Sequence, residues 1–321
     1  MKSFNAACLG TVAMSVVATM CILGCSTQSG RPLAPSPRLL DDVRQSHKTT
    51  AIETTGRPTL ALVLGGGGLR GFAHLGVIRA LEESGVEPDI VVGTSAGALV
   101  GAAYASGLAV ERIEEAAREV RIASLIDFTL SSSGLMRGDN IARWIDRLTG
   151  DVPIEHFPRR FGAVATDLKS GNALLFDKGN PGVAVQASAA VPGPNVPFAY
   201  QGGHLVDGGV SSLVPVRFAR AMGADVVIAV DVLCDGPSDD GLSVPAVLLQ
   251  VGRLQSCRVA AQEKAEADVV ISPAVRVSGM SNKEGQQEAI QAGYAATMAA
   301  LKAIKKRSTG GIDWVALRRA D

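Results

Sequence analysis

The sequence predicts an α/β protein whose central sheet is mainly parallel. Residues 60–64 form a short apolar run that ends in glycines, as a buried parallel strand does. The apolar runs that follow alternate with segments of helical spacing, which is the order of β-α-β units. The 321 residues include 36 glycines and are 47% hydrophobic but only 4% aromatic, a composition that suits close packing of helices on a sheet.

The first predicted β-α-β-α unit follows directly from these patterns. The strand at 60–64 leads into "GGGGLRG", and residues 72–85 then show apolar residues at helical spacing up to a terminal glycine. "DIVV" at 89–92 predicts the second strand. The small-residue segment 96–107 predicts a helix that is buried on most sides. We expect this order to give a parallel sheet with right-handed crossovers.

The rest of the domain continues in the same way to about residue 307. Residues 108–150 are mostly of helical character, and "LSSSGLMRGDN" interrupts them, so this segment is the candidate for a cap or mobile loop near a site. A tail is expected at 308–321. Further strands are expected within residues 160–171, 173–179, 201–210, 225–233 and 267–273, and further helices within 182–193, 245–267 and 284–306. One α/β domain at 59–307 accounts for all of these elements.

The N-terminus has the pattern of an exported lipoprotein. Residues 1–24 read as a signal peptide, and their end with the next residue, "ILGC", resembles a bacterial lipobox, which implies lipidation of Cys25. An ordinary secretory signal and an uncleaved anchor are the alternatives. The polar residues 25–58 read as a flexible tether with an r.m.s. span of roughly 30 Å. We expect a lipid-anchored envelope protein, at the outer membrane facing the periplasm in a Gram-negative organism.

The charge balance and the cysteines exclude several classes of protein. With 31 basic and 31 acidic residues, nothing indicates a nucleic-acid partner. Cys8 and Cys21 lie in the signal segment, so only Cys234 and Cys257 remain for the folded domain. Their spacing matches no metal-ligand pattern, and no metal site is predicted. A buried, unbridged pair is favoured, and a single disulfide in an oxidising compartment is the alternative.

Residues 93–97 read Gly-Thr-Ser-Ala-Gly and connect the second predicted strand to a helix. Such a turn presents the serine Oγ at its tip, over a helix N-terminus whose amides favour negative charge. Gly93 and Gly97 remove side chains where strand and helix approach each other. Ser95 is therefore the predicted nucleophile, and the alternative is a tight turn without chemistry.

The glycine-rich segment at 65–71 also contains a Gly-x-Gly-x-x-Gly pattern, which can mark a dinucleotide site. That kind of site also needs an acid at the end of the second strand, where this chain has Gly93. An oxyanion hole is the better interpretation, with glycine amides pointing into the site and Arg70 adding positive charge. One such donor stabilises a transition state by roughly 3 kcal/mol.

The general base is the less obvious residue, because the chain has only four histidines. His47 lies in the tether and His156 in a loop, while His74 on the first helix suits a packing or capping role. His204 is near a motif, three residues before Asp207 in "GGHLVDGG". An aspartate at the end of this strand can accept the serine proton directly if it lies within hydrogen-bond reach. The alternative for Asp207 is a turn residue that caps its own backbone.

Taken together, "GGGGLRG", "GTSAG" and "DGG" resemble the three signatures of the patatin-like phospholipase family, and "ATDLKSG" and "ASAAVPG" are similar to it as well. The resemblance covers roughly residues 60–235. It implies a three-layer α/β/α patatin-like fold with a mainly parallel central sheet, no metal and no cofactor. It also implies a dyad of Ser95 as nucleophile and Asp207 as base. The oxyanion residues it implies are Gly66, Gly67, Gly68 and Arg70, and its motif residues are Gly71, Gly93, Gly97, Gly208 and Gly209.

The activity that this resemblance implies is hydrolysis of carboxylic esters of lipids through an acyl-enzyme. Phospholipid, lysophospholipid and simple acyl esters all remain open as substrates. A non-catalytic, membrane-tethered binding or scaffold lipoprotein with the same fold is the alternative, and a nucleotide-binding protein is a third. We find no convincing amphipathic membrane-binding helix. A solvated helix end is favoured for "KAIKKR" at 302–307 over a contact with anionic headgroups.

Overall fold

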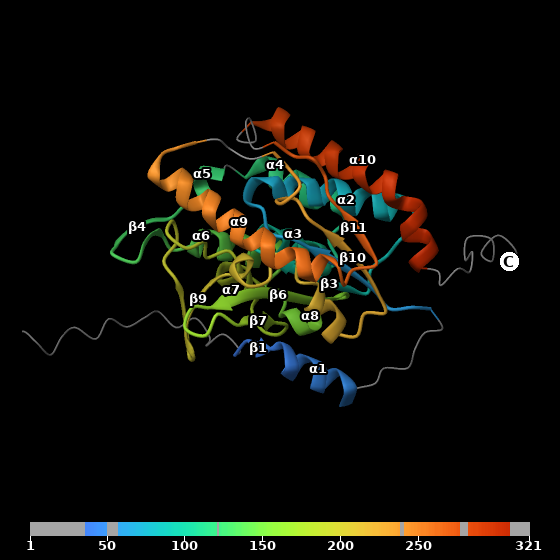
Figure 1. Cartoon of the computed structure of the whole chain (residues 1–321), viewed down its shortest axis with the longest axis horizontal. Helices are drawn as coiled ribbons and strands as arrows, with labels where there is room; N and C mark the ends of the chain where they lie inside the picture. Colours follow the sequence, from blue (N-terminus) through green and yellow to red (C-terminus); the bar gives the residue numbers. More distant parts are fainter. Residues whose placement is uncertain (1–35, 50–56, 121, 238–240, 277–281, 309–321) are drawn as a thin grey trace, which may run out of the picture. The chain divides into compact units, whose positions relative to one another are not determined.

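The central sheet of the computed structural model has a parallel middle and antiparallel margins. The structure describes residues 36–49, 57–120, 122–237, 241–276 and 282–308 (Figure 1). The order of its main path is β1-β7-β6-β3-β2-β10-β11, and all pairs from β6 to β11 are parallel. The strands on this path are β1 (Arg38–Leu39), β7 (Ala173–Phe176), β6 (Arg160–Asp167), β3 (Ile90–Thr94), β2 (Leu60–Leu64), β10 (Val226–Val230) and β11 (Val269–Ile271). The expected mainly parallel α/β fold is confirmed.

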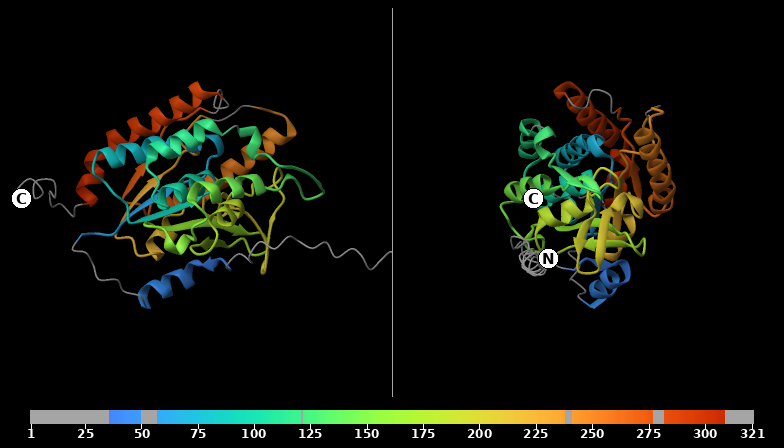
Figure 2. Two further views of the ribbon diagram at one scale, coloured as in Figure 1. Left: turned by 180° about the vertical axis from the view of Figure 1, so that it is seen from behind. Right: turned by 90° about the vertical axis from the view of Figure 1, so that its left-hand side faces the viewer.

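Helices cover both faces of this sheet, so the fold has three layers (Figure 2). The side chains of β2 alternate between two buried clusters, with Leu62 and Leu64 on one face and Ala61 and Val63 on the other. The first face packs against helices α2 (Phe72–Glu83), α3 (Ala96–Ala105) and α10 (Lys283–Ser308), and the second against α1 (Leu40–Thr49) and α8 (Val216–Ala221). The near-continuous apolar sequence of the central strands follows from burial on both faces.

The register along β6 brings together two strands that are distant in the sequence. The parallel strand β3 covers the first part of β6 and ends where Thr94 pairs with Val164. Strand β9 (Gly203–Asp207) then runs antiparallel along the same edge and ends where Asp207 pairs with Ala165. The carboxyl ends of β3 and β9 therefore meet head to head on neighbouring residues of β6. Strand β8 (Phe198–Tyr200) pairs with the outer side of β9.

The interrupted helical segment at 108–150 folds as the sequence suggests, with a β-hairpin at the interruption. Helix α4 (Val110–Glu119) and the short α5 (Ile122–Leu125) precede the hairpin of β4 (Phe128–Ser131) and β5 (Gly134–Met136), and α6 (Asp139–Thr149) follows it. Elsewhere the structure has helices α7 (Pro181–Ser188) and α9 (Val244–Lys264) and the 3-10 turns η1 (Gly68–Gly71), η2 (Ile154–His156) and η3 (Gly208–Val210).

The expectation of a flexible tether across 25–58 is wrong for residues 38–49. Strand β1 pairs antiparallel with β7, and the guanidinium of Arg38 forms an ion pair with Asp177. Helix α1 buries Val43 on the sheet. A few apolar side chains at helical spacing suffice for this docking within an otherwise polar segment. Cys25, the signal segment and the tail from 309 lie outside the described residues. Among the described residues, no helix combines the length and hydropathy needed to span a membrane.

Candidate active site

Ser95 occupies the sharp turn between β3 and α3, as the sequence predicts. Its backbone has φ 54° and ψ −121°, a conformation that residues other than glycine rarely adopt. The turn packs so closely that a Cβ on Gly97 would lie 2.0 Å from the carbonyl oxygen of Leu64, and one on Gly93 would lie 2.4 Å from that of Gly97. Both motif glycines are thus required sterically, and they place Ser95 at the N-terminus of α3.

The side chain of Ser95 lies beside the carboxyl group of Asp207 in the wall of one cavity, where it favours the ionised form of this carboxyl group. The head-to-head ends of β3 and β9 produce this contact. Asp207 also accepts the Gly209 amide at 2.7 Å, so it caps its own turn while it faces the serine. Burial raises the pKa of Asp207 to about 6, against the opposing effect of the Ser95 side chain and of the hydrogen bond from Gly209. A carboxylate with a pKa near neutrality, in contact with the serine hydroxyl, is suited to accept its proton.

None of the four histidines lines the cavity around Ser95 in the part of the chain that the structure describes. His204 is exposed on β9, and His156 lies in η2. His74 on α2 is fully buried, and its Nε2 lies 2.8 Å from the carbonyl oxygen of Gly65. Burial lowers the pKa of His74 to about 4, so the ring is neutral and Nε2–H donates to this carbonyl. The packing role expected for His74 is confirmed, and its contact supports the start of the glycine loop.

The glycine loop and Arg70 lie beside Ser95, with one correction to the expected donors. Gly66, Gly67, Gly68 and Arg70 line the same cavity as Ser95. The Gly66 amide, however, donates to the carbonyl oxygen of Leu213 at 3.0 Å, so it is engaged in holding the loop and does not serve as an oxyanion donor. In the described part of the chain the amides of Gly67 and Gly68 donate to no backbone carbonyl. Gly68 has φ +57°, which fits a glycine at this tight turn.

Two hydroxyl side chains that the sequence analysis did not identify hold the chain at the carboxyl ends of β3 and β9. Ser188 on α7 accepts the Ser95 amide at 2.9 Å and donates to the Val164 carbonyl at 2.6 Å. Thr166 on β6 donates to the Asp207 carbonyl at 2.9 Å. Ser188 lies in "ASAAVPG", a stretch noted only for its family likeness. A lone hydroxyl at the end of a helix made mostly of small apolar residues was the signal that could have identified it.

A third support comes from α9, far along the chain. Glu263 is buried, and its carboxylate accepts a hydrogen bond from Ser212 Oγ at 2.6 Å. The Ser212 carbonyl in turn accepts the Thr94 hydroxyl at 2.8 Å, and its amide donates to the Gly208 carbonyl at 2.8 Å. Thr94 and Gly208 are the chain neighbours of Ser95 and Asp207, so this network braces both.

The dyad opens into a cavity of about 850 Å³ with largely apolar walls. This volume lies within the range of small-molecule sites. The candidate cap contributes Leu135 from the hairpin, and α9 contributes several aliphatic residues. Its apolar lining residues include Leu135, Val191, Pro192, Pro194, Val210, Leu213, Leu233, Val244, Leu248 and Leu249. Within the described residues no cluster of His, Cys, Asp or Glu is arranged to hold a metal ion.

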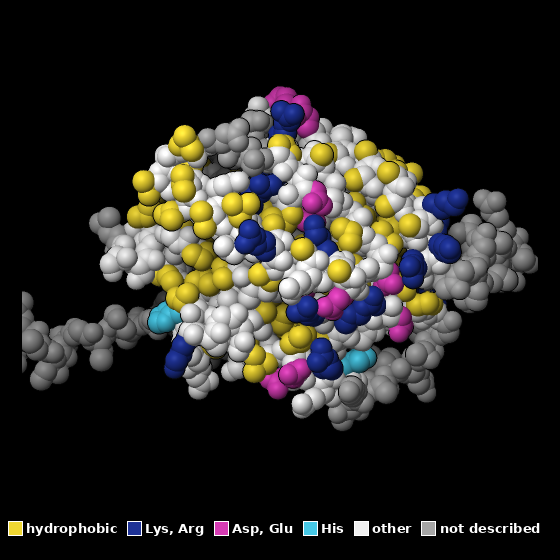
Figure 3. All heavy atoms as spheres, in the orientation of Figure 1, with side chains coloured by type: hydrophobic (Ala, Val, Ile, Leu, Met, Phe, Trp, Pro, Cys, Tyr) yellow, Lys and Arg dark blue, Asp and Glu magenta, His cyan; other side chains and the backbone are white. Residues whose placement is uncertain are grey.

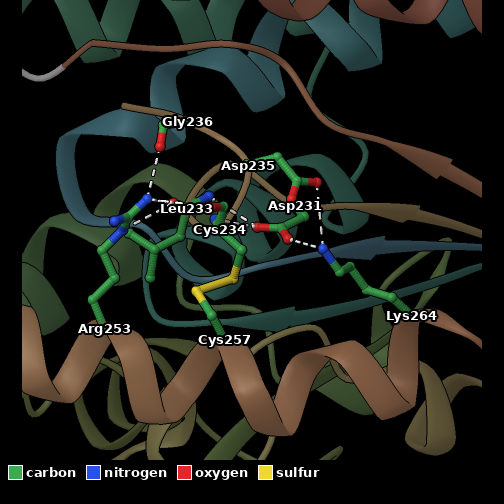
Figure 4. The surroundings of a disulfide bond; sticks show 8 residues. All are labelled: Asp231, Leu233, Cys234, Asp235, Gly236, Arg253, Cys257 and Lys264. Atoms are coloured by element: carbon green, nitrogen blue, oxygen red, sulfur yellow. Dashed lines mark hydrogen bonds and ion pairs between the residues drawn. A yellow bond between two sulfur atoms is a disulfide. The ribbon is translucent and has the colours of Figure 1, made fainter. Parts of the chain in front are cut away.

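Helix α9 is fastened over this cavity by a disulfide and by buried charge (Figure 4). Cys234, which follows β10, is bonded to Cys257 on α9, so the favoured expectation of an unbridged pair is wrong. Sequence spacing could not reveal this contact, because it depends on how α9 folds back across the sheet. The guanidinium of Arg253 donates to the carbonyls of Leu233, Cys234 and Gly236. At the C-terminal end of the helix, Lys264 pairs with Asp231 at 2.6 Å.

Comparison with known proteins gives a consistent family. The profile described as "Patatin-like phospholipase" matches residues 62–220. An uncharacterized NTE family protein of Mycobacterium tuberculosis is 38% identical over 179 residues, which cover 54% of this chain and 49% of the relative. A second one from that species is 32% identical over 273 residues, covering 76% of this chain and 47% of the relative. The chain thus spans about half the length of these mycobacterial relatives.

Two further matches extend the comparison. Patatin-like phospholipase domain-containing protein 6 of Mus musculus is 38% identical over 182 residues, which cover 54% of this chain and 13% of that protein. The crystal structure of VipD from Legionella pneumophila superimposes with a TM-score of 0.53 at 15% identity, over 86% of this chain and 72% of that one. At this identity the likeness shows a shared fold. Through residues 62–220, with all three glycine-containing motifs in place, the chain belongs to the patatin-like phospholipase family.

Proposed function

We propose that this protein is a serine acyl-hydrolase that cleaves carboxylic esters of lipids, with Ser95 as nucleophile and Asp207 as general base. The observation that carries this proposal is the placement of the two side chains beside each other at the wall of an apolar cavity. Ser95 sits at a strained turn over a helix N-terminus, and no histidine is needed to accept its proton. The family membership supports the same chemistry.

The first half of the reaction forms an acyl-enzyme. The ionised Asp207 takes the proton of Ser95 Oγ as this oxygen attacks the ester carbonyl carbon. The negative charge that develops on the carbonyl oxygen is stabilised by the amides of Gly67 and Gly68 and by the positive charge of Arg70. Collapse of the tetrahedral intermediate breaks the ester C–O bond, and Asp207 returns its proton to the leaving alcohol.

The second half regenerates the enzyme. Asp207, again ionised, accepts a proton from a water molecule that attacks the acyl carbon of the Ser95 ester. The intermediate then collapses with release of the carboxylic acid, and the proton returns to Ser95 Oγ. All steps use one carboxyl group, which alternates between base and acid.

The proposal that the substrate is a lipid ester rests on the volume and the lining of the cavity. Its aliphatic walls suit an acyl chain, and its position beside Ser95 puts the ester carbon within reach of Oγ. Phospholipids, lysophospholipids and simple acyl esters all present such a chain. The lipobox-like "ILGC" supports the additional proposal that the chain is lipidated at Cys25 and held at a bacterial envelope membrane, where such lipids occur.

Labelling of the full chain by a fluorophosphonate tests the nucleophile. We expect the probe to label the wild type and the control Ser106→Ala, at the C-terminal end of α3, but not Ser95→Ala. Hydrolysis of a panel of phospholipid, lysophospholipid and short-chain ester then defines the substrate class, with Asp207→Asn expected to be inactive on all three. Folded wild-type protein that neither labels nor hydrolyses any of them would support the scaffold alternative instead.

A further inference from the structure

We propose that the outward face of the first half of α9 docks the mouth of the catalytic cavity onto a lipid bilayer with anionic headgroups. This inference rests on the proposed function, because it concerns how a lipid ester reaches Ser95. It names an interaction surface that the sequence pattern did not indicate, since no membrane-binding helix was expected there. The surface, called the α9 face below, consists of Leu242, which precedes the helix, and of Val244, Leu248, Leu249, Val251 and Leu254 on it.

The α9 face is unusually apolar for an exposed helix. Leu242 is 90% exposed, Val244 73%, Leu248 66% and Leu254 53%. Figure 3 shows hydrophobic side chains gathered over the first half of this helix, whereas charged side chains lie toward its C-terminal end. Contiguous apolar surface on a folded protein marks a binding site for another apolar surface.

This face is continuous with the catalytic cavity. Val244, Leu248 and Leu249 are each exposed to solvent and also line the cavity that contains Ser95. Leu135 of the β4–β5 hairpin is likewise both exposed and part of the cavity lining. An acyl chain leaving a bilayer pressed against this mouth would meet mainly aliphatic side chains on its path and would be less exposed to water.

The charge on this stretch fits an anionic lipid surface. Residues 241–262 contain no aspartate or glutamate, and their only charged residues are Arg253 and Arg258. Arg253 is engaged with backbone carbonyls under the helix, whereas Arg258 is exposed. Within residues 241–262 no acidic side chain therefore opposes contact with an anionic lipid surface, and Arg258 can approach its headgroups. A second copy of the chain would instead bring a like charge to this surface.

The α9 face is also held rigid before any contact. The Cys234–Cys257 disulfide and the carbonyl contacts of Arg253 fix the middle of the helix to the segment after β10. Little conformational entropy is therefore lost when a bilayer covers the face, so the exposed leucines contribute most of their transfer free energy to binding.

Insertion of α9 is tested with a tryptophan substituted into the full chain. Leu254→Trp and the control Met298→Trp, which is on α10 and replaces a residue 42% exposed, are each made in the Ser95→Ala background so that lipid is not consumed. Phosphatidylglycerol vesicles with brominated acyl chains should quench the fluorescence added by Leu254→Trp and not that added by Met298→Trp. Residues 1–35 are the same in both proteins, so any N-terminal anchor contributes equally.

A kinetic experiment tests whether docking serves catalysis. Leu242→Ser/Leu254→Ser changes two exposed positions that do not line the cavity. We expect hydrolysis of phosphatidylglycerol vesicles to fall by at least about tenfold, since both leucines lose most of their transfer free energy. Hydrolysis of a water-soluble short-chain ester should not change, and Met298→Ser should leave both rates unchanged.

The results that would overturn docking differ from those that would overturn the hydrolase function. Equal quenching of the two tryptophan variants, or equal vesicle hydrolysis by the double serine variant and Met298→Ser, would overturn the docking proposal. A dimer in sedimentation velocity that Leu242→Ser/Leu254→Ser dissociates, without lipid quenching, would overturn it in favour of a second copy. If the wild type hydrolyses no soluble ester while Leu254→Trp is still quenched, docking stands and the proposed hydrolase function fails.

Discussion

Glu263 and Ser212 form a buried hydrogen bond of 2.6 Å that ties α9 to the turn carrying Asp207. Because Ser212 also contacts Thr94 and Gly208, Glu263 acts on the dyad without touching it. Its second oxygen accepts the Arg217 amide at 3.3 Å. Burial raises the pKa of Glu263, which these two hydrogen bonds partly oppose. Glu263 is thus placed to hold both members of the proposed catalytic pair in position.

Removal of this contact should lower turnover more than substrate binding. Glu263→Ala leaves the Ser212 hydroxyl without its acceptor, which costs about 1–3 kcal/mol of stability. We expect a lower kcat and a nearly unchanged KM for a short-chain ester, measured with urea unfolding on the same samples. Glu263→Gln keeps one acceptor oxygen and should restore most of the turnover. If Glu263→Ala raises KM and leaves kcat unchanged, Glu263 does not position the dyad.

The pH dependence of turnover should follow the ionisation of Asp207. Its pKa of about 6 means that the base becomes protonated, and inactive, as pH falls through this value. We expect kcat/KM for a soluble ester to decrease about tenfold for each pH unit below 6 and to be flat above it. A profile that titrates near pH 4 instead would mean that Asp207 is better solvated than its burial indicates.

The same shift makes Asp207 a source of instability at neutral pH. Because its folded pKa is raised from 3.8 to about 6, the stabilisation of the folded state by the neutral carboxyl is fully present below pH 3.8 and is lost as pH rises through 6. Asp207→Asn should therefore be more stable than the wild type at pH 8 by about 3 kcal/mol. Below pH 3.8 the difference should vanish. Urea unfolding at both pH values measures it.

The strained turn at Ser95 should also cost stability. Glycine adopts φ 54° without strain, so Ser95→Gly should be more stable than Ser95→Ala by about 1 kcal/mol, although both are inactive. Asp151, at φ 56°, provides a control away from the dyad. Asp151→Gly should gain stability in thermal unfolding while keeping full activity. Equal stability of the two Ser95 variants would show that the surrounding structure relaxes the turn.

The disulfide should stabilise the folded state mainly because it restricts the conformations of the unfolded chain. A sequence separation of 23 residues between Cys234 and Cys257 corresponds to a loop whose closure stabilises the folded state by about 3 kcal/mol. Cys234→Ser/Cys257→Ser should lose this amount in urea unfolding. Reductant should destabilise the wild type and leave the double variant unchanged. A double variant as stable as the wild type would show that Arg253 and Lys264 suffice to hold α9.

Local patterns predicted the first half of the domain well, and the two motifs that they singled out, at Ser95 and Asp207, lie together in one cavity wall. The apolar run of β2, the small-residue helix α3 and the turn at Ser95 each depend on neighbours in the chain. The predicted bounds of β2 agree with the structure, and those of α3 differ from it by two residues at the end of the helix. Asp207 could be singled out from the sequence because Gly208 and Gly209, which follow it, form a recognisable motif with it. The donor assignment at Gly66 failed because its amide partner, Leu213, lies far along the chain.

Features that depend on packing between distant parts of the chain could not be predicted from the sequence. Glu263 is an ordinary acidic residue near a helix end until α9 folds across the sheet and buries it against Ser212. The docking of α1 rests on a few apolar residues in a polar stretch, too few to stand out. The α9 face has no simple periodicity, because aliphatic residues both line the cavity and face the solvent.

The head-to-head junction of β3 and β9 has a consequence for variation in this fold. The proposed nucleophile and base are placed by adjacent residues of one strand, Val164 and Ala165, so a single peptide unit of β6 sets their spacing. The connections between Ser95 and Asp207, including the hairpin at the cavity mouth, can therefore lengthen or shorten without moving the reacting atoms. Substrate preference can diverge through these loops while the chemistry stays the same.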